Sequence, residues 1–202
     1  DMLRMLVGLG HEQVIAVGTS MGGLMTMMMA NMHPDIFKAA IINDIGPEIA
    51  PKGLERLASY VGQAMEFDDW DGAIAAIKAQ GPDIFPDYTA KDWRQFAGNV
   101  CEQRHDGRVR FRYDPIIAQG LDGDKTSTVP PDLWPLYHGM PSFPLLILRG
   151  EGSDILAAKT ADQMVKARDD VRLATIPQRG HAPMLIEPVA INAIRDFLEP
   201  FA

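Results

Sequence analysis

A serine between two glycines is the part of this chain best suited to do chemistry. Residues 18–22 have the sequence Gly-Thr-Ser-Met-Gly, with a β-branched apolar run before them and a Leu-, Met- and Ala-rich stretch after them. A buried strand, this pentapeptide and a helix in succession are typical of a nucleophilic serine on a sharp turn. Side chains at Gly18 and Gly22 are expected to collide across such a turn. Ser20 is therefore a candidate nucleophile; the simpler interpretation is that it only caps the helix.

Two further side chains could activate that serine. A hydroxyl is a weak nucleophile near neutral pH, and it needs a base that is itself oriented by an acid. Asp154 comes shortly after the apolar run 144–150, and His181 comes shortly after the run 171–176. Both runs are typical of buried strands, and the carboxyl ends of parallel strands meet at one edge of a sheet. We therefore expect Ser20, His181 and Asp154 to form a catalytic triad.

Each partner of the serine also has a simpler interpretation. An Asp in a Gly/Ser-rich loop is usually a turn residue or a helix cap, and a His after a Gly is usually a solvated loop residue. Asp44 competes with Asp154 for the role of the acid, because it follows another strand candidate, residues 39–43. The loop of Asp154 matches the usual position of such an acid, which favours Asp154, and Asp44 is expected to turn the chain into the next segment.

Three stretches carry a resemblance to a known superfamily: residues 18–23, 148–154 and 179–183, the last with Glu187 and Pro188 beyond it. On these residues the chain resembles the α/β-hydrolase superfamily, over most of its length except the middle. The resemblance implies an α/β fold with a mostly parallel sheet flanked by helices. It also implies that Ser20 attacks the substrate, that His181 moves the proton and that Asp154 orients His181. The backbone N–H of Met21 would then supply half of an oxyanion hole.

The same resemblance implies more strands than the chain contains. It places several of them ahead of the apolar helix expected at residues 2–9, one with a His-Gly-type loop that completes the oxyanion hole. The strand candidates found here are residues 14–17, 39–43, 145–149 and 171–176. Half a sheet would leave the strand before Ser20 with an unpaired edge, which is an aggregation hazard. We therefore expect the chain to be the C-terminal part of a protein of roughly 280–300 residues.

The middle of the chain breaks the alternation of strands and helices. Helical patterning is found at residues 54–65, 70–80 and 91–101, with Thr89 as the expected N-cap of the last, and residues 108–113 alternate as a short extended stretch would. We predict a hydrolase core formed by residues 1–47 and 142–202, with a mainly helical cap, residues 48–141, inserted over the active site.

The predicted cap and the helix after Ser20 supply candidates for the substrate pocket. Met25, Trp93 and Trp134 are predicted to line it, and Met21 could also face an apolar substrate. For the tryptophans the simpler interpretation is that they hold the cap together.

Composition limits the classes of partner and cofactor. The 202 residues include 19 Lys and Arg and 27 Asp and Glu, a net charge of −8 without a block of like charge, which disfavours nucleic acid and anionic membranes as partners. No run approaches the roughly 18 apolar residues of a membrane span. The single cysteine, Cys101, fits a reducing compartment, so we expect a cytoplasmic protein. His105 and His138 lack partners at metal-ligand spacing, and no glycine-rich phosphate loop is found, so neither a metal nor a cofactor is expected.

The resemblance implies hydrolysis through an acyl-enzyme. The leading hypothesis is a carboxylic ester or lactone of a small, largely apolar substrate. A serine at position 20 disfavours, on the resemblance, the dehalogenase and epoxide-hydrolase branches. Hydrolytic C–C cleavage of ring-fission products is an alternative, but those enzymes usually carry a Trp directly after the catalytic His, and this chain has Ala182. Acyl transfer by the same residues, or a low-turnover ligand-binding receptor on the same fold, are further alternatives.

Overall fold

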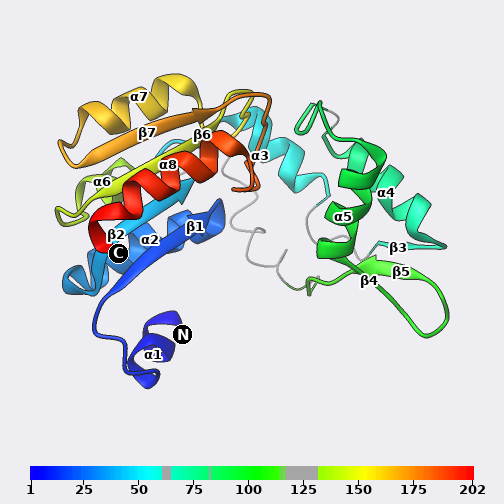
Figure 1. Ribbon diagram of the computed structural model, residues 1–202, viewed down its shortest axis with the longest axis horizontal. Helices are drawn as coiled ribbons and strands as arrows, with labels where there is room; N and C mark the ends of the chain where they lie inside the picture. Colours follow the sequence, from blue (N-terminus) through cyan, green and yellow to red (C-terminus); the bar gives the residue numbers. More distant parts are fainter. Residues whose placement is uncertain (61–64, 82, 115, 117–131) are drawn as a thin grey trace. The chain divides into compact units, whose positions relative to one another are not determined.

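The chain folds into two compact units of different architecture. The computed structural model describes residues 1–60, 65–81, 83–114, 116 and 132–202 (Figure 1). The first unit consists of Asp1–Pro51 and Pro130–Ala202, and the second of Lys52–Val129. The first unit is α/β and the second is mainly helical.

A parallel sheet forms the centre of the first unit. Its described strands are β1 (Val14–Thr19), β2 (Phe37–Asn43), β6 (Leu145–Gly150) and β7 (Val171–Ile176), in the order β1-β2-β6-β7. All four predicted strands are confirmed, and three of them are slightly longer than predicted. Because all four run in the same direction, their carboxyl ends lie at one edge of the sheet, as the spacing of the candidate residues predicts.

Helices cover both faces of this sheet, which is the usual arrangement for parallel strands. The helices of the first unit are α1 (Met2–Gly8), α2 (Met21–Met32), α6 (Trp134–His138), α7 (Ala158–Lys166) and α8 (Pro188–Leu198), with 3-10 turns at Pro34–Ile36 and Glu199–Phe201. Figure 1 shows α8 lying across one face of the sheet. There Ala190 and Phe197 of α8 pack against Ile41 of β2 and Leu148 of β6.

The two central strands carry the core. Every residue of β6 is buried, as is every residue of β2 except Lys38. Ile41 and Ile42 are both fully buried and point to opposite faces, so each face of β2 has its own apolar contacts. Burying one such side chain contributes about 1.5–3 kcal/mol. By contrast, β1 has β2 as its one neighbour among the described strands, and its Val17 is 56% exposed.

The second unit combines helices with a small antiparallel sheet. It contains α3 (Pro51–Ala58), α4 (Trp70–Ala79), α5 (Ala90–Val100), β3 (Glu66–Phe67), β4 (Cys101–Gln103) and β5 (Val109–Phe111), with the strands in the order β3-β5-β4. The extended stretch predicted at 108–113 is thus a strand, and Thr89 caps α5 through a capping box with Asp92. The helix predicted at 54–65 begins earlier and ends at Ala58; residues 61–64 lie outside the described residues.

Ion pairs cover the outer surface of this small sheet. Arg104 and Arg108 both pair with Glu66, and Arg110 pairs with Glu102.

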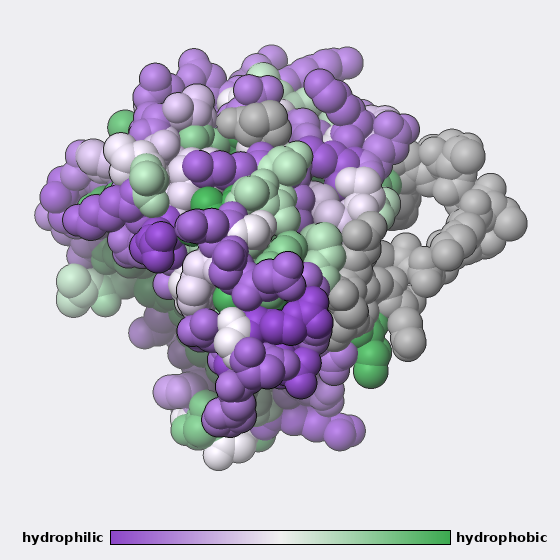
Figure 2. All heavy atoms as spheres, turned by 90° about the vertical axis from the view of Figure 1, so that its right-hand side faces the viewer, coloured by the Kyte–Doolittle hydropathy of each residue, from purple (hydrophilic) through white to green (hydrophobic). Residues whose placement is uncertain are grey.

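The described residues on the molecular face in Figure 2 are mostly hydrophilic, with hydrophobic ones scattered among them. None of the helices in the described ranges combines the length and the apolar character that a membrane crossing requires.

Helix α6 belongs to the first unit, although it falls within the predicted cap, residues 48–141. Asn31 of α2 donates from Nδ2 to the carbonyl of Leu136 at 2.8 Å, and the Tyr137 hydroxyl donates to the carbonyl of Met164 in α7 at 2.9 Å. These contacts attach α6 to two helices of the α/β unit. The second unit is therefore shorter than the predicted inserted segment.

One partly buried ion pair joins the start of β7 to the segment before β6. The Arg168 guanidinium donates to Asp170 and to the carbonyls of Met140 and Pro141, while Asp170 also accepts from Ser142 Oγ and Phe143 N. Burial by itself raises the pKa of Asp170, but the hydrogen bonds from Arg168, Ser142 and Phe143 outweigh it and hold the pKa below its ordinary value.

Asp170→Asn should therefore destabilise the protein in a pH-dependent way. A carboxyl whose pKa is lowered by folding stabilises the native state above its ordinary pKa of about 3.9, and this contribution is lost as the pH falls through the folded value. We expect a loss of about 1–3 kcal/mol at pH 7 that shrinks in acid, measured by urea unfolding at several pH values. Asp169→Asn, at the exposed residue next to Asp170, is the matched control. Equal losses of unfolding free energy in both variants would contradict a stabilising role for the Asp170 carboxylate.

Candidate active site

Ser20 lies on the sharp turn that the sequence predicts. It joins β1 to α2 with φ 51°, a conformation that is strained for a residue with a side chain. Ser20 occupies the N-cap position of α2, yet its side chain makes no capping hydrogen bond. The interpretation of Ser20 as a simple helix cap is therefore wrong, and its hydroxyl is available for another partner.

The two glycines of the turn have different roles. A Cβ at Gly18 would overlap the backbone carbonyl of Gly22, so only glycine fits there. A Cβ at Gly22 would meet nothing within 4 Å. The expectation that both positions exclude a side chain is thus correct for Gly18 and wrong for Gly22. Gly23 is the second tight position, because a Cβ there would overlap the side chain of Ile45.

His181 connects Ser20 to a carboxylate. Its Nε2 lies 2.9 Å from Ser20 Oγ, and its Nδ1 lies 2.9 Å from Asp44 Oδ2. The His181 side chain is 6% exposed and that of Asp44 is 0% exposed. Because a carboxylate can only accept hydrogen bonds, Nδ1 carries the proton and Nε2 is left to accept from the serine hydroxyl. This arrangement can move a proton from the hydroxyl to the imidazole.

Both oxygens of the Asp44 carboxylate are engaged. Oδ1 accepts the backbone N–H of Gly150 at 2.8 Å, while Oδ2 contacts His181. Asp44 has φ 59°, and its own N–H donates to the carbonyl of Leu148 at 2.8 Å, which extends the contact between β2 and β6 by one residue. Buried hydrogen bonds to a charged group are strong, so Asp44 is held in one orientation.

The structure corrects the acid predicted from the sequence: Asp44, not Asp154, contacts His181. The reason is the register of the sheet. Thr19 and Asn43 are partners at the ends of β1 and β2, so the residues that directly follow them, Ser20 and Asp44, are neighbours at the same edge. Asp154 comes after β6, one strand further from β1, and it has interactions of its own.

The loop that carries His181 crosses the end of β6 to reach Asp44. A Cβ at Gly150 would lie 2.5 Å from the carbonyl oxygen of Gly180 and 2.6 Å from that of Arg179. The missing side chain of Gly150 therefore lets this loop pass close to the strand end. On the far side of His181, Asn43 donates from Nδ2 to the carbonyl of Pro183 at 2.8 Å.

Asn43 is a contributor that sequence reasoning missed. It is fully buried at the end of an otherwise apolar strand, and it also donates to Thr19 Oγ1 at 3.1 Å. A polar residue at the end of a buried apolar run was the available signal, because such a side chain must find a hydrogen-bond partner.

Comparison with known proteins identifies the family of this chain. The sequence matches the Alpha/beta hydrolase family over residues 1–194. The chain belongs to this family. The structure of an alpha/beta hydrolase from Novosphingobium aromaticivorans is 42% identical, with a TM-score of 0.90, and the match covers 98% of this chain and 70% of that one.

Two curated hydrolases are also similar to this chain. The 3-hydroxybutyrate-oligomer hydrolase of Cupriavidus necator is 29% identical over 203 residues, which cover 98% of this chain and 69% of that protein. The 2-(acetamidomethylene)succinate hydrolase of Mesorhizobium japonicum is 24% identical over 201 residues, with 98% and 69% covered. Hydrolase is the coarse function that the family and these relatives share.

The four residues predicted to face the substrate lie in surroundings that differ from one residue to the next. Met21 is 53% exposed at the first position of α2, where backbone N–H groups have no partner within the helix, and Met25 is partly buried one turn later. Trp93 is 7% exposed and packs within an aromatic cluster of the second unit, as the simpler interpretation held. Trp134 lies in the first unit, stacked on His138.

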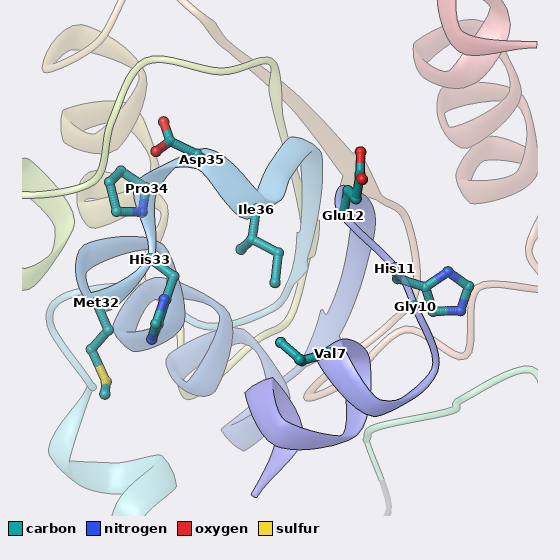
Figure 3. A pocket seen from close by; sticks show the side chains of 9 residues that line it. All are labelled: Val7, Gly10, His11, Glu12, Met32, His33, Pro34, Asp35 and Ile36. Atoms are coloured by element: carbon teal, nitrogen blue, oxygen red, sulfur yellow. The ribbon is translucent and has the colours of Figure 1, made fainter.

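A hollow of about 600 Å³ lies at the opposite edge of the sheet from Ser20. It is lined by residues 32–36, just before β2, and by Val7 and residues 10–12, just before β1. In Figure 3, His11 and His33 stand on opposite sides of it. Among the described residues no group of three metal-ligating side chains is found. Ligands of open α/β sheets bind at the carboxyl ends of the strands, so this hollow is not the candidate active site.

Cys101 does not compete with Ser20 as a nucleophile. It is buried in β4 of the second unit, and burial raises the pKa of its thiol, with Arg112 opposing this in part. A thiol held in its neutral form is a poor nucleophile.

Gly18→Ala and Gly22→Ala form a matched pair that tests the turn. The Cβ of Gly18→Ala overlaps backbone, which cannot move without displacing Ser20, so we expect a fall of several °C in Tm and loss of catalysis. Gly22→Ala has open space in the first turn of α2 and should keep its Tm or gain slightly. Differential scanning calorimetry measures both; equal destabilisation would contradict this description of the turn.

Asp44→Asn and Asp154→Asn decide between the two acids. An amide at position 44 donates to Nδ1, which leaves the proton on Nε2, so His181 can no longer accept the Ser20 proton. We expect kcat/KM of Asp44→Asn to fall by about 10⁴, as is typical when the histidine tautomer is reversed. Asp154→Asn should lose less than about tenfold. Both values of kcat/KM are measured for ester hydrolysis. A larger loss in Asp154→Asn than in Asp44→Asn would restore Asp154 as the acid, as predicted from the sequence.

Proposed function

We propose that this protein is a serine hydrolase that cleaves a carboxylic ester or lactone of a small, largely apolar substrate, with Ser20, His181 and Asp44 as its catalytic triad. The observation that carries the proposal is the hydrogen-bonded chain of those three residues, with 2.9 Å between Ser20 Oγ and His181 Nε2. Nucleophile, base and orienting acid are the parts that acyl transfer requires.

The proposed reaction has two halves. Ser20 Oγ attacks the substrate carbonyl while His181 Nε2 takes the hydroxyl proton, and the imidazolium then gives this proton to the departing alkoxide. In the second half His181 takes a proton from water, whose oxygen attacks the acyl-enzyme. The imidazolium then returns this proton to Ser20 Oγ as the acyl–Oγ bond breaks and the acid is released. In this proposal the Met21 N–H, at the start of α2, donates a hydrogen bond to the developing oxyanion; one such donor is worth on the order of 2.7–4 kcal/mol.

Burial of the acid explains why it orients the base so firmly. Asp44 is 0% exposed and both its oxygens are bonded, so the imidazolium formed during attack gains a fixed, desolvated counter-charge. The strained backbone of Ser20 keeps its Oγ clear of the helix and aimed at His181.

The relative from Cupriavidus necator supports an ester as the bond that is cleaved. Its name is 3-hydroxybutyrate-oligomer hydrolase, and hydroxy acids joined through their own hydroxyl and carboxyl groups form esters. This similarity, at 29% identity, supports an ester as the type of bond proposed here, and short hydroxyacyl esters belong among the substrates to be tried.

A fluorophosphonate probe tests the proposal directly. We expect a covalent adduct on Ser20, identified by peptide mass spectrometry, and none in Ser20→Ala or His181→Ala. Ser142→Ala, which removes a hydroxyl at the other edge of the sheet, is the matched control and should label normally. Loss of Ser20 or His181 should reduce kcat by several orders of magnitude. A folded protein without label would overturn the proposal and favour a ligand-binding role.

Substrate panels then separate the reactions that share this machinery. p-Nitrophenyl esters of increasing chain length, γ-lactones, 3-hydroxybutyrate dimers and vinylogous ring-fission products are compared by kcat/KM. Turnover of esters with no turnover of ring-fission products is expected; the opposite preference would contradict ester hydrolysis as the main activity.

A further inference from the structure

Glu187 is a buried carboxylate that contacts both arms of the loop carrying His181. Its Oε1 accepts from Arg179 Nε at 2.8 Å and from the backbone N–H of Met184 at 3.0 Å. Arg179 precedes His181 in the chain and Met184 follows it. A single oxygen therefore joins the two ends of the segment that presents the imidazole.

The Glu187 carboxylate does not serve the helix that follows it. Glu187 is the N-cap residue of α8, and its side chain makes no capping hydrogen bond to that helix. The side chains that usually cap a helix in this way are the shorter ones of Ser, Thr, Asp and Asn. The Glu187 side chain instead contacts the His181 loop, so its role belongs to the loop rather than to the helix.

Burial makes this contact hard to replace. The side chains of Arg179 and Glu187 are 11% and 6% exposed, and within the described ranges Glu187 Oε2 is buried without a hydrogen-bond partner. Water therefore has little access to substitute for either partner. Loss of the positive partner leaves a buried charge uncompensated, which is the costly way to break such a pair.

The loop that carries His181 needs contacts with other residues to hold its conformation, because its own backbone does not favour that conformation. Gln178 has φ 55° and Leu185 has φ 65°, so residues with side chains adopt the left-handed region on both sides of His181. Such conformations persist only where surrounding contacts impose them. Asn43 provides one such contact, to Pro183, and Glu187 provides two more.

From this geometry we infer that Glu187, through Arg179 and Met184, is a positioning residue that holds His181 between Ser20 and Asp44. The inference rests on the proposed function. His181 makes both its contacts at 2.9 Å, and a displacement of about 1 Å can cost on the order of 100-fold in rate. Glu187 thus acts on the reaction without touching the substrate.

The test compares Glu187→Gln with Asp170→Asn. Glu187→Gln keeps an acceptor for Met184 but removes the charge facing Arg179. Asp170→Asn removes the negative charge from another partly buried Arg–carboxylate pair of this unit, which lies at the opposite edge of the sheet, with side chains 9% and 18% exposed. Three quantities are measured: kcat and KM with a p-nitrophenyl ester, the rate of fluorophosphonate labelling of Ser20, and the downfield NMR resonance of the His181 Nδ1–H, assigned with His181→Ala.

We expect Glu187→Gln to lower kcat and the labelling rate by about 10- to 100-fold, with KM within about threefold, and to shift or broaden the His181 resonance. Asp170→Asn should lower Tm and leave all three quantities unchanged. Wild-type kinetics and an unchanged resonance in Glu187→Gln, even with a lower Tm, would overturn the inference. If Glu187→Gln does not fold, the same three quantities are measured for Arg179→Lys. A fall in kcat and labelling rate with a changed His181 resonance would then support the inference, and wild-type values would overturn it.

The resonance separates failure of this inference from failure of the proposed function. It reports the His181–Asp44 hydrogen bond and needs no turnover. If wild-type protein is not labelled by the probe, the proposed function fails, and the resonance alone then decides whether Glu187 positions His181.

Discussion

The candidate chemistry depends on one buried carboxylate that joins three parts of the fold. Asp44 follows β2, accepts an N–H from Gly150 at the end of β6, and contacts His181 from the loop after β7. At 0% exposure its hydrogen bonds form in a low-dielectric setting, where they are strong and where an unpaired charge would be expensive. The contact that orients the imidazole therefore also helps to hold its loop against the sheet.

Backbone strain is concentrated at the same edge of the sheet. Ser20, Asp44, Gln178 and Leu185 are the residues other than glycine with positive φ in the described part of the chain. All four lie on the turn, strand end or loop that form the candidate site. Short-range preferences do not produce these conformations, so the sheet, the Asn43 and Glu187 contacts and the close approach at Gly150 must impose them. The buried core of β2 and β6 supplies the stability that this requires.

The predictions that succeeded rest on local patterns. Apolar runs bounded by turn residues identified the four parallel strands, and Thr89 with Asp92 three residues later is a capping signal contained within one turn. The sharp turn that carries Ser20, the candidate nucleophile, was recognisable because a strand, a glycine-bounded serine and a helix are adjacent in the chain. Gly22 was misjudged, since open space next to a glycine is a property of its surroundings.

The sequence by itself determined the α/β fold class, the strands that end at one edge, and the candidates for nucleophile and base, because each is encoded by residues that are neighbours in the chain. The choice of acid was decided by the tertiary structure alone. Asp44 and Asp154 both follow buried strands, and nothing local distinguishes them. Strand order and register place Asp44 beside Ser20 and bring the His181 loop across Gly150 to meet it. Contacts between residues more than a hundred positions apart depend on how strands pair, and pairing is a property of the folded sheet.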